Sequence, residues 1–141
     1  LLVYPAMFLY RHYLELELKG ITRDARTLLS EPGGMPSGHK IQGLWDTCSP
    51  LARKVFSGEP TQELDELGRL IGEFADIDPT AQAFRYPVDM AGQETLPKIR
   101  LVDLRNTQEV LAKMSTLLEG ISAGLEQHLD FKGEIQSECV E

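Results

Sequence analysis

The sequence has few of the residues from which metal sites and catalytic centres are usually built. It contains three histidines and two cysteines, and these are scattered without the ligand spacing of a zinc site or a CxxC motif. Nucleotide-binding loops of the GxGxxG and GxxxxGK(S/T) types are absent, as is a GxSxG nucleophile elbow. The sequence therefore predicts no metal site and no cofactor.

Long apolar runs and an excess of basic residues are lacking too. No stretch reaches the roughly 20 apolar residues that span a bilayer. The apolar start LLVYPAMFLY meets Arg11 and His12 with no basic region before it, which is not the pattern of a signal peptide. The 14 basic and 22 acidic side chains give a net charge of −8, which disfavours a broad DNA-binding surface. We expect no membrane association and a cytoplasmic protein whose Cys48 and Cys139 are free thiols.

What the sequence has in abundance is helical periodicity. In the first 29 residues one apolar stripe is spaced by three or four, through Met7, Tyr10, Leu14, Leu18 and Ile21. A second stripe contains Leu9, Tyr13 and Leu16. The remaining polar strip is narrow and holds Arg11, His12, Glu15 and Lys19. We expect this helix to be the most enclosed of the bundle, with the pairs Arg11–Glu15 and Glu15–Lys19 as local helix support. The alternative places Arg11 and His12 in a polar site on a mostly buried helix.

Two shorter helices are expected in the middle of the chain. The loop SEPGGMPSGHK precedes the first, with Ser37 as its N-cap and an interruption or kink at Pro50. Thr61 or a neighbour caps the second. Gly68 and Gly72 lie one turn apart on that helix and are expected to admit a neighbouring helix closely.

The last helix is predicted over Leu101–Leu129, with Gly133 beyond its end and a frayed acidic tail. Its packing seam has a/d spacing and consists of Leu104, Leu111, Leu118 and Leu125 with Met114 and Ile121 interleaved. His128 continues the seam and is expected to make a structural contact near the helix end.

Residues 78–98 have three prolines and no helical period. Arg85 lies there between two aromatic residues and is a candidate ligand for phosphate or carboxylate. The predicted fold is all-α, an antiparallel bundle of four to five helices with one long irregular loop (about 78–100) before the last helix. We expect a single domain over residues 1–141. Because the first residue is Leu rather than Met, the chain is expected to be trimmed or part of a longer one.

Four short motifs together resemble a divergent HEPN-type domain, named for nucleotide-binding domains of higher eukaryotes and prokaryotes. They are FLYRHYLELELK in the first helix, GHKIQGLW at the second, FRYPVD, and VDLRN opening the last helix. The resemblance implies a helical bundle that commonly dimerises. It also implies metal-independent RNase activity in toxin–antitoxin, phage-defence or RNA-processing systems, or binding without catalysis.

The catalytic pattern of that family is Arg, often followed by Asn, Asp or His, with a His four to six residues further along the helix. Arg105 and Asn106 match its first half. The positions expected to hold the His are occupied by Glu109, Val110, Leu111 and Ala112. Proton transfer in an RNase would therefore fall to His39 or His12, placed beside Arg105 by the fold.

The leading prediction is a HEPN-like binding or dimerisation module without catalysis, homodimeric, in a prokaryotic stress or phage-defence setting. Its partner would be a protein, a nucleotide or RNA, contacted through Arg11, Arg85 or Arg105. The first alternative is a metal-independent endoribonuclease that uses Arg105 and Asn106 with His39 or His12. The second is a structural dimerisation domain whose exposed apolar seam on the last helix is covered by a second copy.

Overall fold

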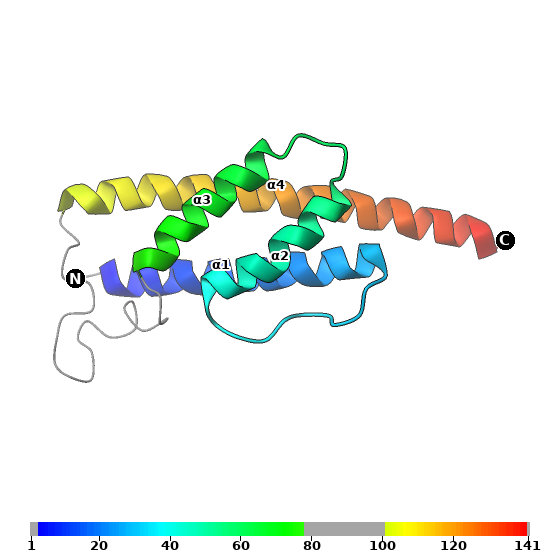
Figure 1. Ribbon diagram of the computed structural model, residues 1–141, viewed down its shortest axis with the longest axis horizontal. Coiled ribbons are helices and arrows are strands. Elements are labelled where there is room, and N and C mark those ends of the chain that lie inside the picture. The colour runs from blue at the N-terminus through cyan, green and yellow to red at the C-terminus, as the bar shows by residue number, and fades with distance from the viewer. Residues whose placement is uncertain (1–2, 78–100, 141) are drawn as a thin grey trace.

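The computed structural model describes residues 3–77 and 101–140, which form four helices and no strand. The helices are α1 (Val3–Leu29), α2 (Ile41–Val55), α3 (Gln62–Ile77) and α4 (Leu101–Val140). Two layers result, with α1 and α4 side by side in one and α2 and α3 crossing over them in the other (Figure 1). The predicted all-α bundle is confirmed.

The helices do not all alternate in direction. In the pair α1 and α4, Ser122 bonds Glu17 and Lys132 bonds Thr27, so both helices run the same way. Lys54 at the end of α2 likewise pairs with Glu31 just beyond the end of α1. Only α3 runs against its neighbours, as Figure 1 shows. The predicted antiparallel order therefore holds for α2–α3 and α3–α4 but not for α1–α2 and α1–α4.

The direction of α2 follows from the length of the connection before it. Residues 30–40 are enough chain to span about 35 Å when extended. They run back along α1, so that His39 lies beside Glu15, halfway along that helix. A tight turn after Leu29 would have forced α2 to run antiparallel to α1.

The core lies between the two layers. The predicted seam of α4 is confirmed by its buried members, which are Leu111, Met114, Leu118, Ile121 and Leu125. The side chain of Leu104 lies outside the described part. The close approach predicted at Gly68 is also confirmed, since a Cβ built there would meet Nε1 of the buried Trp45 at 3.0 Å. At Gly72 the nearest side-chain atom is 3.9 Å away, an ordinary contact.

The predicted enclosure of the first helix is wrong. Leu14 and Leu18 of its first stripe are buried, but Leu9 and Leu16 of its second stripe are 64% and 51% exposed. The polar strip of this helix lies partly inside the bundle, with Arg11 and Glu15 at 3% and 5% exposure. The reason is that α2 packs on the side of α1 that carries Glu15 and leaves the Leu9 side uncovered.

Two predicted boundaries in the middle of the chain also differ. Ser37 is not the N-cap of α2, because the helix begins at Ile41 after an extended Lys40 that makes no side-chain cap. Pro50 does not interrupt α2, which continues to Val55. Thr61 does precede α3, and its carbonyl accepts the first backbone bond of that helix from Asp65.

The last helix is longer than predicted, because Gly133 lies within α4 and the helix continues to Val140. Its C-terminal turns extend past the end of α1 (Figure 1). Lys132 contacts the end of α1, where it donates to the carbonyls of Thr27 at 2.8 Å and Leu28 at 3.4 Å. A lysine in this position satisfies carbonyls that the end of α1 leaves without intrahelical partners.

Candidate functional site

A compact polar cluster on α1 brings together residues that are distant in sequence. The carboxylate of Glu15 accepts hydrogen bonds from Arg11 (3.1 Å) and Lys19 (2.9 Å), one turn away on either side. Nδ1 of His39, from the connection before α2, lies 2.7 Å from the same carboxylate. One buried acid therefore holds three basic side chains.

The three basic side chains of the cluster differ in their exposure to solvent. Arg11 is 3% exposed, Lys19 is 13% exposed at its side chain, and the His39 side chain is 69% exposed. The guanidinium of Arg11 is thus a structural cation inside the bundle rather than a surface group. Only the imidazole of His39 presents a large part of itself to solvent.

The charges around Glu15 keep it ionised. Burial alone would raise the pKa of this carboxyl group, but hydrogen bonds and positive charge from Lys19 and His39 outweigh burial and lower its pKa from 4.5 to about 2. If the imidazole donates its Nδ1 proton to this carboxylate, Nε2 is left as a proton acceptor in the exposed part of the ring.

The other residues predicted for a site are not in this cluster. His12 is exposed and stacks on Phe8, with ring centroids 6.4 Å apart. Arg105 and Asn106 lie in the first turns of α4, but their side chains are outside the described part of the structure, as is Arg85. The proposed meeting of Arg105 with a histidine therefore stays a prediction.

His128 does not contact a helix terminus as predicted, because α4 continues for three turns beyond it. Its ring instead meets that of Phe56 edge-on, with centroids 5.6 Å apart. This is a structural contact between α4 and the end of α2.

The second candidate feature is an apolar stripe on the outer face of α1. We define the α1 stripe as Ala6, Leu9, Tyr13, Leu16 and Gly20. These residues are spaced by three and four in alternation, which is the a/d spacing of a coiled coil. Leu9, Leu16 and Ala6 are exposed, and Tyr13 and Gly20 are partly so.

On the α4 side, the α1 stripe borders an open groove of about 440 Å³. Its lining is apolar on the α1 side, where it consists of Ala6, Leu9, Tyr10 and Tyr13, and polar on the α4 side, where it consists of Ser115 and Glu119. Burial, together with the negative charges of Glu17 and Glu119, raises the pKa of Tyr13. The groove is therefore apolar on the α1 side and acidic on the α4 side.

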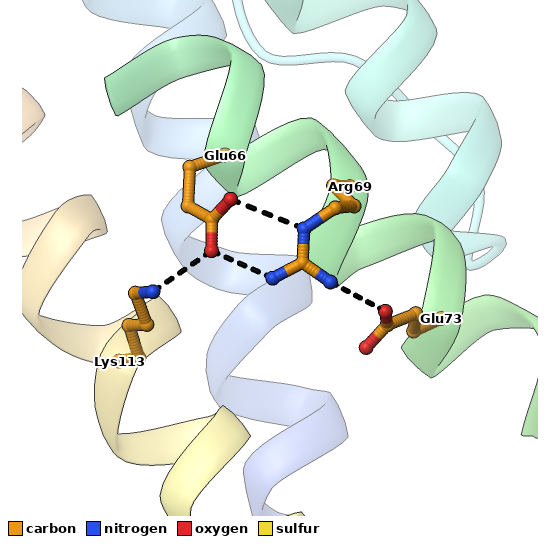
Figure 2. A network of polar contacts seen from close by, with 4 residues as sticks. All are labelled: Glu66, Arg69, Glu73 and Lys113. Carbon is orange, nitrogen blue, oxygen red and sulfur yellow. Dashed lines mark hydrogen bonds and ion pairs between the residues drawn. The ribbon is translucent and has the colours of Figure 1, made fainter. Parts of the chain in front are cut away.

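The acidic run of α3 forms a solvated charged face. Glu66 pairs with Arg69 at 2.7 Å and with Lys113 of α4 at 2.8 Å, and Arg69 also reaches Glu73 (Figure 2). All these side chains are in contact with water, and each cation faces a carboxylate. The network ties α3 to α4 and offers no unbalanced charge to a ligand.

Neither a metal site nor a membrane span is found among the residues that the structure describes. In residues 3–77 and 101–140, no group of three or more His, Cys, Asp or Glu side chains is arranged to hold a metal ion. Within the same residues, none of the helices combines the length and apolarity required to cross a bilayer.

Sequence reasoning missed two features of this region. The contact between Glu15 and His39 joins residues 24 apart through an irregular connection, and no periodic signal predicts it. The α1 stripe was visible as a pattern, but it was interpreted as core.

Comparison of the sequence with protein-family models and with curated proteins, and of the fold with solved structures, finds no match. What the chain does must therefore be inferred from its own geometry.

Proposed function

We propose that this chain is a non-catalytic helical interaction module that docks through the outer face of α1. The observation that carries the proposal is the α1 stripe. A helix that is already packed into a bundle on one side gains nothing from placing Leu9 and Leu16 in water on the other, and exposed contiguous apolar faces mark interaction surfaces.

The remaining polar groups support this assignment. Arg11 and Lys19 are both held by the buried Glu15, and Glu66 and Glu73 of α3 are paired with Arg69 and Lys113. The described surface thus offers an apolar face more clearly than a charged binding site. The HEPN-like resemblance and the prokaryotic, cytoplasmic, stress or defence setting that it implies remain part of this proposal.

The docking function is tested by expressing the tagged chain in the cells from which it comes and measuring the size of its assembly by size-exclusion chromatography. We expect it to elute well above the 15.8 kDa of a single chain. Changing Leu9→Glu and Leu16→Glu together should return it to monomer size, because two charges cannot be buried in an apolar contact. The matched control is Phe131→Glu, a 63% exposed apolar residue outside the stripe, which should leave the assembly intact. An unchanged elution of the double variant would contradict the proposal.

A second candidate function, metal-independent RNA cleavage, is favoured by the contact between Glu15 and His39. A carboxylate that holds one nitrogen of an imidazole while the other nitrogen faces solvent is the arrangement of a general base. Arg105 would supply phosphate stabilisation.

This second candidate is decided by incubating the purified chain with RNA in the presence of a chelator. If it is an RNase, His39→Ala should slow cleavage by about 10²–10⁴-fold, the usual contribution of a general base, and Arg105→Ala should abolish it. His128→Ala, which removes an imidazole outside the cluster, is the control and should leave the rate unchanged. The interaction-module proposal expects no cleavage by any of these proteins.

A further inference from the structure

We propose that the occupant of the α1 stripe is the same stripe of a second copy of this chain, paired in parallel about a two-fold axis. This inference rests on the proposed docking function of α1 and adds the identity of the partner and its orientation. It is carried by two independent observations, the spacing of the apolar residues and the sign of the charges on either side of them.

The spacing is that of a helix that packs along another helix. Ala6, Tyr13 and Gly20 take the a positions and Leu9 and Leu16 the d positions. Leucine at both d positions is shared with two-stranded parallel coiled coils, whereas the a positions hold two small residues and a tyrosine. Because α1 is already held as a helix by its buried opposite face, pairing would not have to pay the entropy of forming the helix.

Basic side chains line one edge of the stripe, and acidic side chains line the other. On the α2 side the g positions are His12 and Lys19, and on the α4 side the e positions include Glu17 and Asp24. In a parallel pair, each g side chain faces the e side chain five residues later on the other helix. His12 would then face Glu17 of the second copy, and Lys19 would face Asp24 of the second copy.

These side chains have local partners, yet each keeps capacity for another. Lys19 donates to Glu15, and an ammonium has three N–H groups. Glu17 accepts from Ser122 through one oxygen, and Asp24 accepts from Arg23 through one oxygen. The second oxygen of each carboxylate can accept the cross-copy bond.

An antiparallel pair lacks this complementarity. It brings e against e and g against g, which sets the acidic edge against an acidic edge and the basic edge against a basic one. The charge pattern therefore selects the parallel arrangement, in which both copies of α4 point the same way as α1.

The stripe is short, and this sets the strength of the pairing. The next d and a positions hold Arg23 and Thr27, so the apolar contact ends at Gly20. We expect a dimer that dissociates in the range of roughly 1–100 µM, which corresponds to a modest binding free energy. The equilibrium is therefore concentration-dependent in a normal biochemical assay.

Sedimentation equilibrium of the purified chain tests the pairing. The wild type should move from monomer to dimer across the micromolar range, and Leu16→Glu should weaken association by at least tenfold with an unchanged helical circular dichroism spectrum. Phe131→Glu should dimerise like the wild type. A wild-type chain that stays monomeric at a few hundred micromolar would overturn the inference.

The pairing of the two edges is tested by exchanging the basic and acidic residues at positions 12 and 17. His12→Glu alone should weaken the dimer, because it puts two carboxylates opposite each other. Glu17→Lys alone should weaken it too, because it removes the carboxylate that faces His12. The two changes together should restore it. If the double variant loses as much dimer affinity as the two single variants lose together, the two edges do not face each other as inferred.

The orientation is tested by disulfide cross-linking in a Cys139→Ser background, with Cys48 left in its buried position. A parallel pair brings residue 6 opposite residue 6 and residue 20 opposite residue 20, so Ala6→Cys and Gly20→Cys should each form cross-linked dimers alone. An antiparallel pair sets a positions against d positions and keeps residue 6 away from residue 6, so neither variant would then cross-link alone. A chain that is dimeric by sedimentation but forms no cross-link through either cysteine would overturn the orientation.

These outcomes are distinguishable from failure of the proposed function. If the purified chain is monomeric but its cellular assembly is lost in the Leu9→Glu, Leu16→Glu variant, α1 docks onto a different protein and only the self-pairing is wrong. If the cellular assembly is unaffected by that variant, the docking function itself is wrong.

Discussion

Replacing Glu15 by Gln is expected to lower the free energy of unfolding by about 3–5 kcal/mol, the usual cost of removing one partner from a buried ion pair. The substitution keeps the size of the side chain but leaves the buried guanidinium of Arg11 without the negative charge 3.1 Å away. Urea denaturation followed by circular dichroism measures the change, with an unaltered slope confirming that the same surface is exposed on unfolding.

Glu66→Gln is the matched control for this prediction. The pKa of Glu66 is also lowered to about 2 by two cations, through hydrogen bonds from Arg69 and Lys113, but these side chains lie at the surface (Figure 2). Water replaces such contacts readily, so the midpoint of unfolding should hardly move. Equal losses in the two variants would contradict the role assigned to burial.

Glu15 also contributes to the loss of stability at acid pH. The pKa of Glu15 is about 2 in the folded chain and 4.5 in a free chain, so the unfolded state takes up the proton first as the pH falls. The stabilisation is therefore complete above pH 4.5 and is lost between about pH 4.5 and 2. In the Glu15→Gln variant the loss of stability across that window should be smaller than in the wild type.

Trp45→Ala is expected to cost about 3–5 kcal/mol, because it empties a large volume in the core where α2 crosses α3. Trp45 is 6% exposed, and its indole lies against the backbone of α3 at Gly68. The contact between Trp45 and Gly68 gives a second prediction. The effect of Gly68→Ala on the free energy of unfolding should change sign when Trp45 is replaced by Ala.

Gly68→Ala in the wild type should destabilise the fold, because its Cβ would lie 3.0 Å from Nε1 of a tryptophan that is packed on all sides. In the Trp45→Ala background that clash is gone, and the same change should stabilise by up to about 1 kcal/mol, the helix propensity difference between Gly and Ala. A double-mutant cycle in urea measures the coupling. Gly120→Ala, with no atom within 4 Å of the new Cβ, should stabilise in both backgrounds.

Periodicity predicted the class of fold and the buried seam of α4 well, since Leu111, Leu118 and Leu125 face the core as their spacing requires. It failed on α1 because two apolar stripes on one helix do not say which of them is covered. That choice is made by α2, whose position depends on the irregular residues 30–40 and so on no repeating pattern.

The polar cluster could be predicted only within one helix. Arg11, Glu15 and Lys19 follow one another at i,i+4, so their mutual contacts were foreseen. His39 was a candidate on chemical grounds, but its contact with Glu15 depends on where the connection places it. The end of α4 was misjudged because Gly133 was taken as a terminator, whereas a glycine in an exposed helix costs only about 1 kcal/mol.

The parallel arrangement of α1 and α4 has a kinetic consequence. The bonds from Ser122 to Glu17 and from Lys132 to Thr27 close loops of 105 residues, whereas Arg53 and Asp65 join α2 and α3 across 12. The entropic cost of loop closure differs between them by about 2 kcal/mol. The chain should therefore fold by first forming the hairpin of α2 and α3, with the two long helices closing around it last. Removing the C-terminal turns of α4 would then speed unfolding while leaving the early hairpin unaffected.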